Sequence, residues 1–223
     1  MTDRRARVGL LRRLAVALAG SARRAGAAAV GSGRWITDSV TETAPHIPIR
    51  DLSTLSEHHG GLQGNALAEA LVATAARSTG AIGVAGGLVA SLELATPPLL
   101  LTTPVQVAAE TLAVVAIELK LVAELHEVYG QPAAGTAAVK TAAYLGAWTR
   151  RHALVRTPGR GGVIITLNAG RRELRRRILR RAGTNMTTVI PFLGGAVAGG
   201  TLNARETRRL AERMVRELGG QLS

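Results

Sequence analysis

Cysteine is absent from the sequence and aromatic residues are scarce. Of 223 residues, 2 Trp, 2 Tyr and 1 Phe are aromatic. The lack of cysteine excludes disulfides, thiol catalysis and zinc sites with cysteine ligands. The 47% of hydrophobic residues are therefore mostly Ala, Leu and Val, which suits closely packed helices and disfavours a sheet sandwich. We predict an all-α protein, a compact bundle of about six or seven helices with Gly-rich apolar hairpins.

Acidic residues are outnumbered by basic ones, which gives a formal net charge of +13. Residues 1–50 hold 9 basic and 3 acidic residues, residues 51–149 hold 3 and 8, and residues 150–223 hold 16 and 4. A cationic surface attracts polyanions, either a nucleic-acid backbone or a leaflet of anionic lipid. A GC-rich genome also encodes Arg in excess over Lys, but this bias does not explain the acidic middle of the chain.

The chain divides near residue 50. Arg12 and Arg13 interrupt the first apolar run, so a signal peptide is not expected, and Pro45 and Pro48 mark a linker. We predict a basic, Ala-rich N-terminal helix and linker over 1–50. A helical domain with an Arg-rich C-terminal part is predicted for 51–223.

Apolar residues recur at helical spacing through much of the second part. A helix restarts near Asp51, and the next one has Asn65 as its expected N-cap. Further helices are expected over about 105–128, 133–154 and 205–218.

Two segments, 78–109 and 182–204, are long and apolar. Glu93 is the only charged residue in the first segment, and neither half of it reaches the roughly 20 residues of a simple transmembrane helix. Whether these segments pack on each other or enter a bilayer stays open. Glycines four residues apart remove side chains from one helix face, so that another backbone can approach. We assign helix packing to Gly83, Gly87, Pro191, Gly195, Gly199 and Asn203.

One carboxylate is expected to be buried. On a helical wheel of residues 105–128, a polar stripe forms, but Glu118 falls on the apolar side. A buried carboxylate must find a partner or take up a proton. A structural ion pair with Lys140 or Arg77 is one interpretation of Glu118, and a proton or ligand site is the other. The stripe consists of Gln106, Glu110, Lys120, Glu124 and Glu127.

The segment 171–181 predicts a basic amphipathic helix with an apolar side formed by Leu174, Ile178 and Leu179. Such a helix can lie on an anionic membrane or follow phosphates, and it can also be a solvated outer face. The absence of aromatic residues for base stacking over 153–186 favours lipid. The candidate lipid or polyanion contacts are Arg171, Arg172, Arg175, Arg176, Arg177, Arg180 and Arg181.

Residues 190–194, Ile-Pro-Phe-Leu-Gly, and 199–203, Gly-Gly-Thr-Leu-Asn, contain a Pro-x-x-Gly and a Gly-x-x-x-Asn pattern. These patterns are similar to the closing pattern of the EcsC family of bacterial proteins, so the chain resembles that family and 51–223 is predicted to be an EcsC-like helical domain. The small-residue run over 61–90 and the segment 117–130 resemble its central helices. The resemblance implies a helical, membrane-linked protein with a link to an ABC transporter, and it carries over no catalytic residue.

A search for an active site finds no catalytic pattern. The histidines, including the adjacent His58 and His59, lack the His-x-x-x-His spacing of a metal site, and no serine lies in a Gly-x-Ser-x-Gly elbow. The segment 157–162 resembles a phosphate loop but lacks its Gly-Lys-Ser/Thr ending. We therefore predict no enzyme activity, no metal and no cofactor.

The favoured interpretation is a cytoplasmic protein that is peripheral at the inner face of the cell membrane. It would bind anionic lipid or a membrane protein through its arginines and apolar hairpins. A basic nucleic-acid-associated protein is the alternative, and a soluble enzyme that uses Glu118 is the third.

Overall fold

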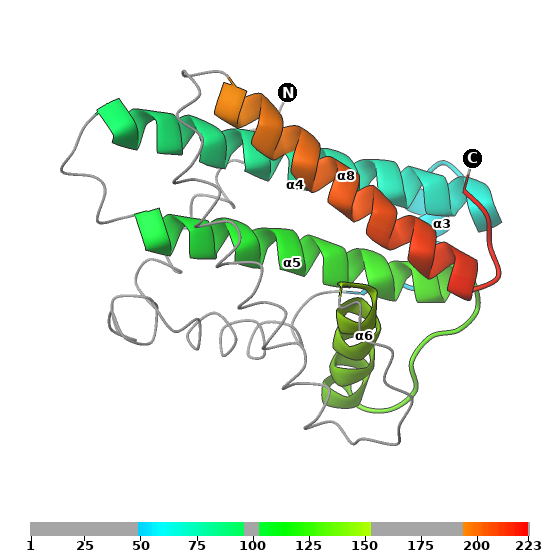
Figure 1. Cartoon of the computed structure of the whole chain (residues 1–223). Coiled ribbons are helices and arrows are strands. Elements are labelled where there is room, and N and C mark those ends of the chain that lie inside the picture. Colours follow the sequence, from blue (N-terminus) through cyan, green and yellow to red (C-terminus); the bar gives the residue numbers. More distant parts are fainter. Residues whose placement is uncertain (1–48, 96–102, 153–193, 223) are drawn as a thin grey trace.

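The computed structural model describes residues 49–95, 103–152 and 194–222, and these ranges contain helices and no strand (Figure 1). The all-α prediction is therefore confirmed for this part of the chain. The N-terminal helix predicted within 1–50 and the arginine-rich helix predicted at 171–181 lie outside the described residues. The helices are α3 (Leu52–His58), α4 (Gly64–Ala95), α5 (Thr103–Val128), α6 (Ala137–His152) and α8 (Gly194–Glu217).

Helix α3 is fixed by local signals at its two ends. Asp51 is its N-cap, and Oδ1 accepts a hydrogen bond of 2.8 Å from the backbone N–H of Thr54. This bond is the largest cause that holds the pKa of the Asp51 carboxyl below its usual value. The helix ends in a turn, where Gly60 and Gly61 have φ of 69° and 82°. Leu55, fully buried, anchors α3 in the core beside α5.

Helices α4 and α5 form an antiparallel hairpin (Figure 1). Helix α4 begins at Gly64, so the prediction of Asn65 as its N-cap is wrong. The carbonyl of Gln63 already accepts the N–H of Leu67 at 3.3 Å, which places Asn65 inside the first turn. The Oδ1 atom of Asn65 instead accepts a hydrogen bond of 2.9 Å from the hydroxyl of Tyr129, at the end of α5.

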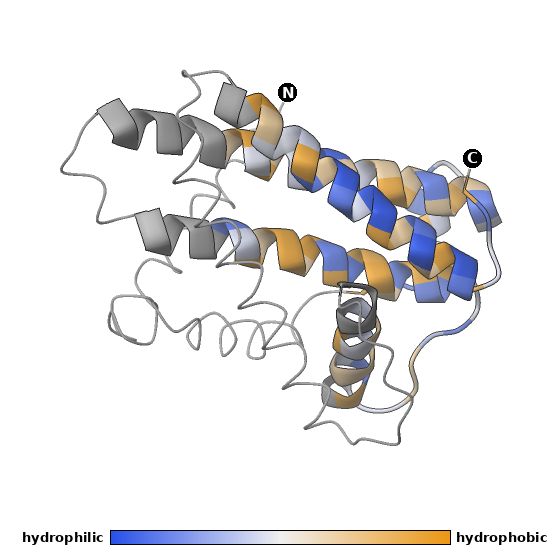
Figure 2. Ribbon diagram, in the orientation of Figure 1, coloured by the Kyte–Doolittle hydropathy of each residue, from blue (hydrophilic) through white to orange (hydrophobic). Residues whose placement is uncertain are grey.

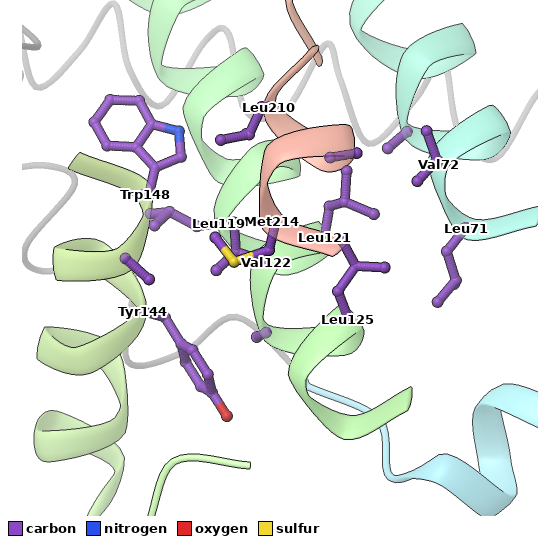
Figure 3. Packing of buried hydrophobic residues seen from close by; sticks show 14 of the residues in the cluster. Leu71, Val72, Leu119, Leu121, Val122, Leu125, Tyr144, Trp148, Leu210 and Met214 are labelled. Atoms are coloured by element: carbon purple, nitrogen blue, oxygen red, sulfur yellow. The ribbon is translucent and has the colours of Figure 1, made fainter. Parts of the chain in front are cut away.

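Helix α5 is the central element, because it contacts α3, α4, α6 and α8. Buried side chains from four helices meet around it (Figure 3). Truncation of one such large side chain to Ala costs about 2–5 kcal/mol of stability. The core residues labelled in the figure are Leu71 and Val72 of α4, Leu119, Leu121, Val122 and Leu125 of α5, Tyr144 and Trp148 of α6, and Leu210 and Met214 of α8.

The polar stripe predicted for α5 is partly buried, because neighbouring helices cover this helix on several sides. Glu124 is only 5% exposed and forms an ion pair with Lys120, one turn earlier on the same helix. Glu110 and Glu127 are half-buried. The ion pair compensates for part of the cost of removing the Glu124 carboxylate from water.

Helix α8 runs beside α4 in the opposite direction, and this pair has the most extensive contact among the described helices (Figure 1). The glycine segment that starts at Gly194 and the charged segment predicted over 205–218 form one continuous helix. Helix α6 lies across the C-terminal part of α5 (Figure 1). Helix α8 therefore packs against the hairpin formed by α4 and α5.

Candidate functional site

A buried polar cluster joins α4, α5, α6 and α8. Its centre is Glu118 of α5, which is 0% exposed. Trp148 Nε1 donates a hydrogen bond of 2.8 Å to Glu118 Oε2, and the Thr207 hydroxyl donates one of 3.3 Å to Oε1. The hydroxyl oxygens of Thr79 and Thr207 lie 2.9 Å apart, and Asn203 Nδ2 donates a bond of 3.0 Å to the Thr79 carbonyl. We call these five residues the buried polar cluster.

The hydroxyl groups of Thr79 and Thr207 can form a hydrogen-bond chain that ends at Glu118. A threonine hydroxyl has a single hydrogen, so when Thr207 donates to Glu118, the short contact with Thr79 requires Thr79 to turn its hydrogen toward Thr207 and away from the Ala76 carbonyl, which lies 3.2 Å from the Thr79 oxygen. Donors from α6 and α8 then converge on the carboxylate. Hydrogen bonds to both carboxyl oxygens offset part of the cost of burying this polar group. The cluster thereby fixes the positions of four helices relative to one another.

Glu118 lies on the buried side of α5, where the helical wheel placed it, but its expected cationic partners are wrong. Within the described part of the chain, neither Arg77 nor Lys140 forms an ion pair with Glu118. Arg77 is exposed and donates a hydrogen bond of 3.3 Å to the Thr74 hydroxyl of its own helix. Helix α6 brings Trp148, two turns beyond Lys140, to the carboxylate.

Sequence reasoning missed Trp148 and Thr207 as partners of Glu118, and Thr79 as the partner of Thr207. A signal is present for Thr207, which lies three residues before the buried Leu210 and seven before Met214, hence on the same helix face. Periodicity indicates that such a polar side chain is buried, but it does not identify the partner on another helix.

The predicted packing glycines have distinct places in the fold. Gly83 of α4 lies against Gly199 of α8, and a Cβ added to Gly83 would lie 2.6 Å from the carbonyl carbon of Gly199. Asn203 is buried one turn further along α8 and belongs to the buried polar cluster. Gly87 and Gly195 lie within α4 and α8. Pro191 is outside the described residues.

Helix α8 presents a row of exposed arginines on the side opposite α4. Three glutamates, at 206, 212 and 217, accompany them on this helix. Across the described ranges basic and acidic residues balance at 11 each, so α8 is a local cationic region in this part of the chain. We call the row the arginine face: Arg205, Arg208, Arg209, Arg213 and Arg216.

The candidate contacts at 171–181 lie outside the described residues, so the arginine face is the cationic surface that the structure can place. It contains no aromatic side chain. The guanidinium group offers several N–H donors that match the oxygens of a phosphate. This surface is therefore chemically suited to a phosphate-bearing partner.

The surroundings of Tyr129 and Tyr144, beside the α5–α6 connection, raise the pKa of both phenols. Burial is the largest cause that raises the pKa of Tyr144, the charge of Glu127 adds to it, and a hydrogen bond of 3.0 Å donated by the Ala133 amide opposes it. Burial, with the charge of Glu69, likewise raises the pKa of Tyr129. Both phenols are therefore neutral at physiological pH.

Metal binding finds no support among the described residues, which contain no group of three or more His, Asp or Glu residues arranged to hold an ion. His126 is engaged structurally: its Nδ1 lies 2.7 Å from the Val122 carbonyl, and its ring meets Tyr144 edge-on at a centroid distance of 5.2 Å. In the same part of the chain, no helix combines the length and apolar character required to cross a membrane.

Comparison with known proteins gives no match, either to a protein-family model, to a curated protein or to a solved structure. The resemblance to the EcsC family therefore stays a prediction.

Proposed function

We propose that this protein is a non-enzymatic, EcsC-like helical protein that binds the anionic inner face of the cell membrane. Its whole chain would form a bundle of about six or seven helices, with the domain division near residue 50. The observation that carries the proposal is the arginine face of α8. A membrane protein partner, such as an ABC transporter, is the alternative occupant of the same surface.

The arginine face suits a membrane surface by its length and chemistry. From Arg205 to Arg216 it extends about 16 Å along the helix axis, so several guanidinium groups can contact lipid phosphates together. Each basic residue near an anionic leaflet contributes about 1 kcal/mol. The segment 171–181 would add further arginines to the same attachment.

The buried polar cluster is almost inaccessible to solvent, which supports a non-enzymatic role. Its members are between 0% and 4% exposed, so a substrate could reach Glu118 only if the helices separated. The carboxylate is bonded to groups of the protein itself, which suits a structural part in the bundle.

Vesicle co-sedimentation of the full chain tests the proposal. The protein should bind vesicles that contain phosphatidylglycerol, should ignore pure phosphatidylcholine, and should be released at high salt because ions screen exposed charges. Replacement of Arg205, Arg209 and Arg216 by Gln should weaken binding by roughly 100-fold, from about 1 kcal/mol per residue.

The matched control replaces the same three arginines by Lys, which keeps the charge and should retain most of the binding. A second control, Glu212→Gln with Glu217→Gln, removes negative charge from α8 and should strengthen binding. Failure of the unmodified chain to bind anionic vesicles at low salt would refute the proposal. Tight, salt-dependent binding to DNA without binding to lipid would favour the nucleic-acid alternative.

A further inference from the structure

The exposed side of α8 changes its chemistry along the helix. Its first part carries Val197 and Leu202, which are 63% and 54% exposed. The arginine face begins at Arg205, less than one turn beyond Leu202. Figure 2 shows this change from hydrophobic to hydrophilic colours along α8.

Val197 and Leu202 cannot turn into the bundle, because glycines hold the inner side of α8 close to α4. A Cβ added to Gly199 would lie 2.8 Å from the Gly83 carbonyl oxygen, and one added to Gly200 would lie 3.1 Å from that of Gly80. The backbones are thus in close contact along this stretch. The rotation of α8 about its own axis is fixed along this stretch, and Val197 and Leu202 must face outward.

Helix α4 extends the apolar surface at the same end of the bundle. Val84 packs over Gly200 and is still 39% exposed. Around it, α4 carries no charged residue from Ser78 to Leu92. Figure 1 shows that this end of α4 lies beside the start of α8 and the start of α5. We call Val84, Val197 and Leu202 the apolar end.

We propose that the apolar end enters the interfacial layer of an anionic bilayer while the arginine face bonds lipid phosphates. This inference rests on the proposed membrane binding and adds an orientation: the start of α8 points into the lipid and its C-terminal end lies at the surface. Interfacial helices bury their apolar residues about 5–10 Å below the headgroups. Arginines on the same side can keep their charged ends at the phosphate level.

The partner of this surface is lipid, because the apolar end and the arginine face follow each other on one exposed surface. The headgroup region of an anionic leaflet offers phosphates beside acyl chains in the same order. A nucleic acid would leave Val197 and Leu202 against a charged backbone. A second copy of the chain would place arginine faces near one another at the cost of charge repulsion.

The chain contains no cysteine, so a cysteine introduced by mutation is the only site that a thiol-reactive label can modify. Val197→Cys and Leu202→Cys variants would each carry an environment-sensitive NBD fluorophore. Arg213→Cys, on the arginine face, and Val139→Cys, on the exposed side of α6, are the controls. Vesicles of phosphatidylcholine and phosphatidylglycerol would contain lipids with doxyl quenchers on their acyl chains.

On these vesicles, probes at Val197 and Leu202 should brighten and be quenched by the doxyl lipids. A probe at Arg213, at the phosphate level, should be quenched much less, and a probe at Val139 should not respond. Substitution of Val197 and Leu202 together by Ser should weaken vesicle binding by roughly 100-fold, since each buries a large apolar side chain. Val139→Ser makes the same kind of change on α6 and should leave binding unaltered.

Unquenched probes at the apolar end, with vesicle binding intact, would overturn the insertion and leave surface attachment standing. Brightening that depends on protein concentration without vesicles would also overturn it, in favour of a second copy of the chain. Absence of vesicle binding by the unlabelled protein would instead refute the proposed function itself. These outcomes separate the two proposals.

Discussion

Substitution of Gly83 by Ala should destabilise the protein far more than the same substitution at Gly80, one turn earlier on α4. A Cβ at Gly83 would lie 2.6 Å from the carbonyl carbon of Gly199 and 2.7 Å from Asn203 Nδ2. Both distances are well below van der Waals contact, and one partner is backbone. A Cβ at Gly80 would meet its nearest atom, the Gly200 carbonyl oxygen, at 3.3 Å.

The size of the effect follows from three contributions. Overpacking costs about 1–3 kcal/mol. Displacement of the Asn203 side chain breaks its bond to the Thr79 carbonyl and leaves buried polar groups unsatisfied, which costs about another 1–3 kcal/mol. Ala is favoured over Gly inside a helix by about 1 kcal/mol. The net loss for Gly83→Ala is therefore about 3 kcal/mol.

Urea unfolding followed by helical circular dichroism measures this difference. For a protein of this size the loss corresponds to a Tm lower by about 6–12 °C. Gly80→Ala should change stability by no more than about 1 kcal/mol, because the gain in helix propensity offsets the milder crowding at 3.3 Å. Equal stability of the two variants would refute the close crossing of α4 and α8.

Two further predictions concern the buried polar cluster and the tyrosines. Glu118→Ala removes the acceptor for Trp148 and Thr207 and leaves a cavity, so it should lower the free energy of unfolding by about 3–5 kcal/mol. Glu118→Gln keeps the shape and one acceptor oxygen and should cost less, and equal losses in thermal unfolding would contradict the cluster. Burial raises the pKa of Tyr129 and Tyr144 above 10.0, so the folded state favours the neutral phenols; stability should be retained below pH 10 and fall above it. The double Phe variant should show a shallower alkaline fall in Tm, whereas an unchanged slope would assign that fall to other groups.

Local sequence patterns were sufficient to predict the helical class and part of its local detail. Apolar spacing predicted a helix in each described range, and the end of α5 was predicted at Val128, where it is observed. The helix expected over 205–218 begins earlier, at Gly194. The wheel of α5 placed Glu118 on the buried side. These features follow from local periodicity, capping chemistry and backbone preferences, which act within one helix.

The tertiary structure alone decided which helix faces meet. Glycine spacing predicted a close approach, but only the packing of α4 against α8 pairs Gly83 with Gly199. Glu118 received Trp148 and Thr207 as partners because α6 and α8 approach α5 from positions that no local pattern specifies. The predicted cationic partners of Glu118 were wrong for this reason. Periodicity indicates which side of a helix is buried, but the neighbour on that side depends on how the whole chain packs.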